Sequence, residues 1–197
     1  MPERDMSTQP RRFAGDQGAV LVEAAFIFPI VFFICLAIME YGMLFAAQST
    51  TQSATRDGAR FASANFAVAG SNQAAADQVM SAVSQDLSAR TGFDTPLQML
   101  VYKADASGNP VSGTLQSCSA SCYHYTWNGS TFVFDMSSPT WTNPQACIGA
   151  SPASATIDSI GVYVEMRHNF ITGAFGSSQT MKEHTVSRLE PLPLSQC

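Results

Sequence analysis

The chain has 197 residues, which is enough for one domain of ordinary size and one additional segment without a second hydrophobic core. Ten Lys and Arg residues against fifteen Asp and Glu residues give a formal net charge of −5, and the sequence contains no basic stripe. Nucleic-acid binding therefore has little electrostatic support.

A long apolar segment dominates the amino-terminal part of the chain. Uncharged residues continue from Ala24 to Met39, and with its flanks the apolar pattern extends from Ala19 to Ala47. This is longer than the apolar core of a secretory signal peptide, which has about 7 to 15 residues, so we expect a transmembrane helix that anchors the chain. Pro29 lacks the amide hydrogen that would bond the carbonyl of Ala25, which predicts a bend in this helix.

A single carboxylate, Glu23, lies in the first turn of the apolar segment. An ionisable group within a membrane span is costly unless a partner neutralises it. Cleavage between Gly18 and Ala19 would create such a partner, because the new α-amino group would lie one helical turn from Glu23. Glu23 would then be the fifth residue of the cleaved chain. The alternative is an interfacial Glu23 that reaches the cytoplasmic face and has no role in assembly.

Further motif residues follow the apolar segment. They are Glu40, Gly42 and Gln48, then Arg56, Gly58 and Arg60. With the Gly18–Glu23 spacing, which resembles the class III prepilin cleavage signature, this pattern is similar to the TadE-like family, the minor pilins of the tight adherence (Tad or Flp) pilus. The resemblance covers roughly Gly18 to Ala64. In addition, a late strand that ends near Arg188 is similar to the carboxyl-terminal end of the family's sequence pattern. Taken without the resemblance, Arg56, Asp57 and Arg60 would be a solvated helical face.

The resemblance implies a function in the assembly, initiation or capping of a Tad-type (type IVc) pilus, and so in surface adhesion. Glu23 would pair with the amino terminus of a neighbouring subunit, and a prepilin peptidase would cut the chain after Gly18. The implied partners are the inner membrane, that peptidase, other major and minor pilins, and the Tad assembly platform. The implied location is the inner membrane, with a single pass and an extracytoplasmic carboxyl terminus; incorporation into the pilus is left open.

The charged residues that flank the segment give a modest signal for this orientation. Three arginines precede the segment and two follow it, a Lys and Arg bias of three against two; these are Arg4, Arg11 and Arg12, then Arg56 and Arg60. We expect residues 1–18 to be a cytoplasmic leader that is cleaved, 19–47 the transmembrane helix, 48–92 a helical stem with a second helix, and 93–197 an extracytoplasmic β-rich domain.

The cysteines agree with export. Cys118, Cys122, Cys147 and Cys197 all follow the apolar segment, whereas Cys35 lies within it and is interpreted as a small buried hydrophobic residue. Four cysteines permit three pairings, of which we favour Cys118 with Cys122 and Cys147 with Cys197. The competing interpretation is a zinc site, but the spacing lacks the paired pattern of such sites.

The remaining sequence predicts an α+β domain. Apolar residues recur at three- and four-residue steps from Ala75 to Leu87, which indicates an amphipathic helix that ends near Arg90. A period of two then predicts strands at 97–104, 123–127, 130–134, 160–166 and 181–189. Asn128-Gly129 predicts a two-residue hairpin loop that pairs Trp127 with Ser130 and Tyr125 with Phe132. The expected fold is an antiparallel sheet beside a long helix, which is also the pilin-like arrangement.

No catalytic motif, cofactor site or metal site is indicated, because the three histidines are scattered at His124, His168 and His184 and no nucleophile or phosphate-binding motif occurs. The aromatic face of Tyr123, Tyr125 and Trp127 is interpreted as core, with a glycan-binding platform as the alternative. Two rival functions stay open. One is an uncleaved, signal-anchored periplasmic binding or scaffold protein, and the other is an exported enzyme whose site sequence spacing does not reveal.

Overall fold

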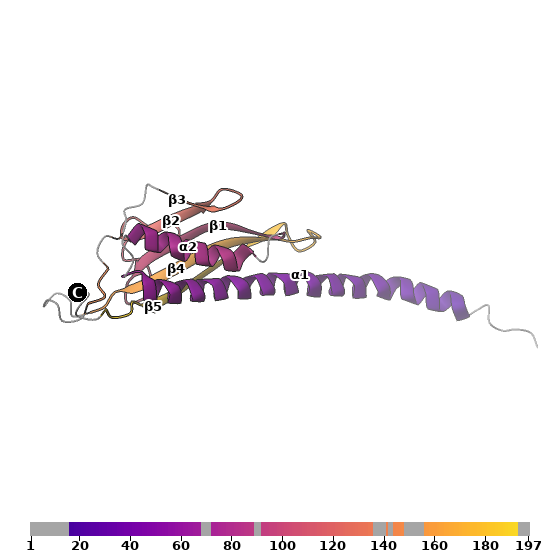
Figure 1. The fold of residues 1–197 in the computed structure, drawn as a ribbon. Helices are drawn as coiled ribbons and strands as arrows, with labels where there is room; N and C mark the ends of the chain where they lie inside the picture. Colours follow the sequence, from indigo (N-terminus) through magenta and orange to yellow (C-terminus); the bar gives the residue numbers. More distant parts are fainter. Residues whose placement is uncertain are drawn as a thin grey trace, which may run out of the picture. The chain divides into compact units, whose positions relative to one another are not determined.

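The computed structural model describes residues 16–67, 72–88, 92–135, 141, 144–147 and 156–192. Within these residues, two helices precede five strands, which confirms the α+β class (Figure 1). The elements are α1 (Asp16–Asn65), α2 (Asn72–Ser88), β1 (Asp94–Ala104), β2 (Cys122–Trp127), β3 (Phe132–Phe134), β4 (Ser159–Asn169) and β5 (Ser178–Arg188).

The chain divides into two compact units, Met1–Gly42 and Met43–Cys197. Helix α1 contributes to both units and continues through Pro29 as one α-helix. Most of the expected leader, residues 1–15, lies outside the described part of the chain, and α1 already begins at Asp16. The bend at Pro29 and the four segment boundaries predicted above stay predictions.

The five strands form one antiparallel sheet in the order β3-β2-β1-β4-β5. The central pair aligns Val101 with Val162, and the neighbouring pair aligns Val162 with Thr185. Because successive side chains of a strand point to opposite faces, one face of the sheet carries the β-branched and aromatic residues of the main core. This is the alternation that the sequence predicted for these strands.

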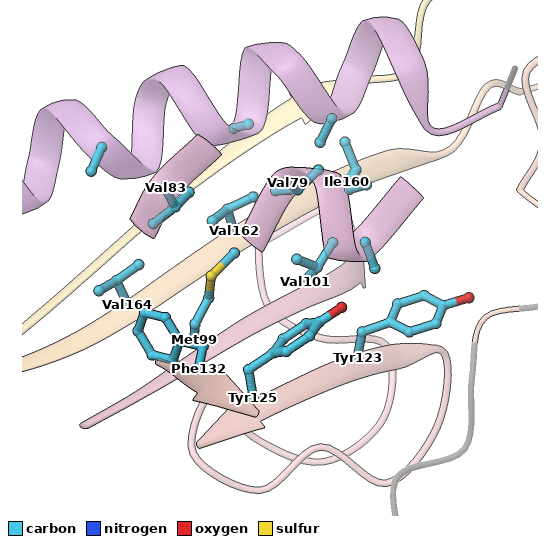
Figure 2. Close-up of a cluster of buried hydrophobic side chains, with 14 of the residues drawn as sticks. Val79, Val83, Met99, Val101, Tyr123, Tyr125, Phe132, Ile160, Val162 and Val164 are labelled. Carbon is cyan, nitrogen blue, oxygen red and sulfur yellow. The ribbon is translucent and has the colours of Figure 1, made fainter. Parts of the chain in front are cut away.

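The main core lies between that face and the helices. Helix α2 contributes its buried Val79 and Val83, and the sheet contributes Met99, Val101, Tyr125 and Ile160 among others (Figure 2). Buried alanines of α1, among them Ala54 and Ala59, join the same cluster. The amphipathic pattern of α2 thus has a simple cause: its apolar stripe covers the sheet, and its polar residues face outward.

The opposite face of the sheet holds a smaller core of Leu100, Tyr102 and Tyr163. The segment between β1 and β2 folds over it, and the Tyr102 hydroxyl donates a hydrogen bond of 2.9 Å to the Gly108 carbonyl. Burial, followed by the nearby Asp105 carboxylate, raises the pKa of Tyr102 to about 12. Both faces of the central strands are therefore covered by other parts of the chain.

The hairpin of β2 and β3 corrects one detail of the sequence prediction. Trp127 pairs with Phe132 and Tyr125 with Phe134, so the register differs by two residues from the expected one. The loop has four residues instead of two, because the Asn128 side-chain oxygen accepts hydrogen bonds from the amides of Ser130 and Thr131. Since the shift is an even number, the predicted aromatic residues keep their face of the sheet.

Candidate functional site

The first part of α1 presents an apolar surface that nothing in the described chain covers. Its large side chains are exposed, with Val20 at 63% and Phe26 at 73% of their full accessible area. The best window of the helix has a mean hydropathy of 2.7, and α1 is long and apolar enough to cross a membrane. A surface of this kind is stable only in a bilayer or against other apolar surfaces. Length and composition fit a single-pass anchor and equally a signal sequence.

Glu23 lies exposed on this apolar surface, in the second turn of α1. Gly18 and Ala19 belong to the same helix, and Ala19 and Glu23 are four residues apart, about 6 Å along the axis on one face. Among the described residues, none forms a hydrogen bond or ion pair with Glu23. The arrangement leaves a carboxylate free to pair with a cation that another molecule, or a new amino terminus, would supply.

The three motif residues at the end of the apolar segment have different surroundings. Glu40 is buried, with 1% of its accessible area exposed. A side chain added at Gly42 would meet no atom within 4 Å. The Gln48 amide donates a hydrogen bond of 3.3 Å to Glu183 on β5.

The second group of motif residues divides into solvated and packed positions. Arg56, Asp57 and Arg60 are exposed, and they have no charged partner among the described residues. Gly58 is different, because a Cβ atom there would lie 2.5 Å from Cγ2 of Val83 and 3.5 Å from Cγ1 of Val162. In this chain Gly58 is a packing position where α1, α2 and β4 meet, and the arginines form a solvated face beside it.

Small residues that the sequence analysis did not single out complete this contact. Thr51 donates a hydrogen bond of 3.1 Å to the sulfur of Met166, and the hydroxyls of Thr55 and Thr185 lie 3.2 Å apart. The sequence contained a pattern that could have predicted this contact, because small residues recur there at three- and four-residue steps. They are all buried: Ala47, Thr51, Ala54, Thr55, Gly58 and Ala62. Small side chains let the helix lie close to the sheet, so this part of α1 is fixed to the domain.

The cysteines partly follow the prediction. The sulfur atoms of Cys118 and Cys122 lie at disulfide distance, with their Cα atoms 6.4 Å apart, which is the favoured first pair. Cys197 lies outside the described residues, so its pairing with Cys147 stays a prediction. The interpretation of Cys35 as buried is wrong within this chain, because its position on the apolar surface of α1 leaves it exposed.

The histidines of the described sheet lie apart from one another. The ring of His124 lies 3.3 Å from an Asp135 oxygen and 2.9 Å from Gln98. The buried His168 lies 2.6 Å from Asp94 through Nδ1. The described residues contain no group of three or more His, Cys, Asp or Glu side chains that could hold a metal ion. Each of these two histidines instead joins two segments of the domain.

A long apolar helix that continues into an α+β domain with an antiparallel sheet is a pilin-like architecture. The comparison with protein families agrees, because residues 18–60 match the TadE-like protein family. The match contains Gly18, Glu23 and all six motif residues discussed above. No curated protein and no solved structure gives a significant match to the chain. Residues 18–60 are therefore a TadE-like domain.

Proposed function

We propose that the protein is a minor pilin or pseudopilin that takes part in the assembly, initiation or capping of a Tad-type pilus, and so in surface adhesion. It is held in the inner membrane by the first part of α1, with the sheet domain outside the cytoplasm. Its proposed partners are the prepilin peptidase, other major and minor pilins and the Tad assembly platform.

The observation that carries this proposal is the position of Glu23 one turn after Gly18 and Ala19, on an apolar helix surface where no described residue covers or pairs with it. A charged side chain in a membrane span costs about 2.5–3.5 kcal/mol on insertion scales. Pairing with the α-amino group of a neighbouring subunit would offset this cost and fix the axial position of one helix against the next. A helix that only anchored the chain would gain nothing from the carboxylate.

The mechanism is physical and involves no covalent step after processing. In the membrane, the apolar surface of α1 is covered by lipid. On extraction into a pilus, the same surface packs against neighbouring helices, and Glu23 sets the register. The small residues from Ala47 to Ala62 hold the later part of α1 against the sheet.

The test is replacement of Glu23 in cells that make the pilus. Glu23→Ala removes the cost of placing a charge in the membrane, so the variant is expected to insert and to be cleaved normally. It also removes the pairing that fixes the axial position of neighbouring helices, so the variant is expected to fail in pilus formation and in co-purification with partner pilins. Glu23→Asp is expected to be intermediate, because the charge remains but the reach is shorter.

Asp86→Ala is the matched control, because Asp86 is an exposed carboxylate on α2 and does not belong to the apolar segment. It is expected to leave pili unchanged. Normal pili and wild-type attachment in Glu23→Ala cells would show that Glu23 is an ordinary interfacial residue and that the pairing mechanism is wrong.

A further inference from the structure

A pocket of about 430 Å³ opens in the sheet domain, and none of the residues that line it belongs to the TadE-like segment 18–60. It lies between α2 and the β2–β3 hairpin, and the start of β1 closes one side. The volume falls within the range of small-molecule sites, which is about 300–1,000 Å³. Nothing in the proposed assembly mechanism uses this pocket.

Two aromatic residues, Trp127 and Phe132, line the pocket together with Leu87 and Pro96. Trp127 is half-buried, whereas its strand neighbours Tyr123 and Tyr125 are buried in the core. Phe132 packs edge-on against Trp127 with ring centroids 5.2 Å apart at an interplanar angle of 73°. The tryptophan therefore has a fixed position and still presents part of its surface to the pocket. This separates Trp127 from the rest of the aromatic face that the sequence assigned to the core.

The polar lining is rich in acceptors and contains a single charged side chain. Two of its serines already donate their hydroxyl protons within the chain, Ser84 to the Met80 carbonyl at 2.7 Å and Ser88 to the Gln85 carbonyl at 2.8 Å. Ser130 likewise donates to the Asn128 side-chain oxygen at 3.1 Å. These serine oxygens keep lone pairs for a ligand. One Asp94 oxygen already lies 2.6 Å from Nδ1 of His168, so only the other carboxylate oxygen is left to accept from a ligand.

The charge of the lining restricts the ligand further. Among the described residues, no Lys, Arg or His side chain lines the pocket, and Asp94, which pairs with His168 behind the lining, is the one ionisable group. A phosphate or carboxylate ligand would lack the cationic partner that such groups require. The pocket thus suits an uncharged ligand with many hydrogen-bond donors and an apolar face for Trp127.

We propose that this pocket binds a neutral saccharide of one or two rings. Sugar hydroxyls donate to the serine, glutamine and aspartate oxygens, and the C–H face of a ring lies against Trp127. The inference goes beyond the proposed role in pilus assembly and does not depend on it, because binding can be measured on the isolated subunit. A negative result for saccharide binding therefore does not contradict the proposed role in pilus assembly, and a negative result for pilus assembly does not contradict saccharide binding.

The experiment uses the full chain in a non-glycosidic detergent, with both tryptophans labelled as 5-fluorotryptophan and followed by fluorine NMR. Trp141 is an internal reference, since it is 3% exposed and does not line the pocket. The probes are maltose, cellobiose, lactose and di-N-acetylchitobiose. At least one is expected to shift the Trp127 resonance in a saturable way and to leave Trp141 in place; Trp127→Phe assigns the two signals.

Variants of α2 test the location. Gln85 lines the pocket and its neighbour Asp86 does not, although both are exposed. Gln85→Ala is expected to weaken binding about tenfold, the loss of a well-placed hydrogen bond, and Asp86→Ala is expected to leave it unchanged. Ser88→Tyr fills the pocket from its rim and is expected to abolish the shift.

Absence of a Trp127 shift with all four probes at high millimolar concentration would overturn the proposal. A shift that survives Ser88→Tyr would also overturn it, because the saccharide would then bind elsewhere. A synthetic peptide Ala-Ser-Thr-Gln-Ala serves as the competing ligand. If that peptide shifts Trp127 and the saccharides do not, the pocket is a peptide groove and the saccharide assignment is wrong.

Discussion

Gly42 and Gly58 lie on one helix and in one motif, yet their surroundings differ. A Cβ atom at Gly58 would lie 2.5 Å from Val83, whereas one at Gly42 would meet nothing within 4 Å. Gly58→Ala is therefore expected to destabilise the domain by about 1–3 kcal/mol, the usual cost of overpacking. Gly42→Ala is expected to be neutral or to stabilise by about 0.5–1 kcal/mol, because alanine favours the helix. Denaturant unfolding of the detergent-solubilised chain measures both.

A double-mutant cycle identifies the cause of the Gly58 effect. In a Val83→Ala background the colliding methyl group is absent, so the added cost of Gly58→Ala is expected to shrink. An equal cost in both backgrounds would mean that helix conformation, and not the contact with Val83, requires the glycine.

Buried tyrosines make the domain sensitive to alkali. Burial raises the pKa of Tyr123 to about 12, as it does that of Tyr102. Burial and the Asp77 carboxylate raise the pKa of Tyr125, and burial and Glu165 raise that of Tyr163. An unfolded tyrosine ionises near pH 10, so these groups stabilise the folded state fully below about pH 10. That stability is lost as the pH rises through the folded values, at about 12 for Tyr102 and Tyr123.

The expected result is a cooperative alkaline transition. Tyrosinate absorbance of these four residues should appear together with the loss of the sheet's circular dichroism, at a pH clearly above 10. Gradual ionisation of all five tyrosines near pH 10 with an intact sheet signal would contradict the burial that the structure shows.

At the scale of elements, the bond between Cys118 and Cys122 fixes the segment that precedes β2. The ring is short, with a sequence separation of four, so the chain-entropy model predicts a stabilisation of about 2 kcal/mol. Replacement of both residues by Ala is expected to lower the free energy of unfolding by about that amount, and reduction is expected to make the segment more sensitive to protease. Alkylation of unreduced protein that labels both Cys118 and Cys122 would show that the bond does not form.

The elements that the sequence predicted well are those with a local pattern. Helix α2 and strands β1, β4 and β5 have clear periods, and the structure places them within a few residues of the expected bounds. The hairpin register failed because it depends on one side chain, Asn128, bonding two amides of the loop. The cover of Tyr102 by the loop at Gly108 was not visible either, because it joins segments whose packing has no periodic signal.

In the candidate site too, the features with a local sequence pattern were predictable, and those that depend on packing between distant segments were not. Glu23 could be identified from the sequence, because a lone charge in an apolar run is conspicuous at the level of composition. The packing role of Gly58 could not, since it depends on Val83 and Val162 from two other elements. Cys35 was misjudged because an apolar run does not indicate whether protein or lipid covers each side chain.

At the scale of the whole molecule, the two compact units differ in what they need to cover their apolar residues. The unit Met43–Cys197 has its own core and needs no partner to bury it, whereas the apolar surface of the unit Met1–Gly42 requires a bilayer or other helices. An uncleaved periplasmic scaffold protein would have the same two units. The discriminating property is therefore the amino terminus of the mature chain, and not the fold.

Cleavage after Gly18 is expected to distinguish a processed minor pilin from an uncleaved periplasmic scaffold protein. In cells with an active prepilin peptidase, the mass of the membrane-extracted chain should correspond to a mature protein that begins at Ala19. Gly18→Leu is expected to leave the full-length precursor in the membrane, because a bulky side chain would obstruct the peptidase at the cut. Gly42→Ala is the matched control, since both glycines lie on α1 with no atom within 4 Å of an added Cβ, so packing limits neither change. A wild-type chain that still begins at Met1 in such cells would identify an uncleaved anchor, and no α-amino group would then lie one turn from Glu23 to set the register of a pilus.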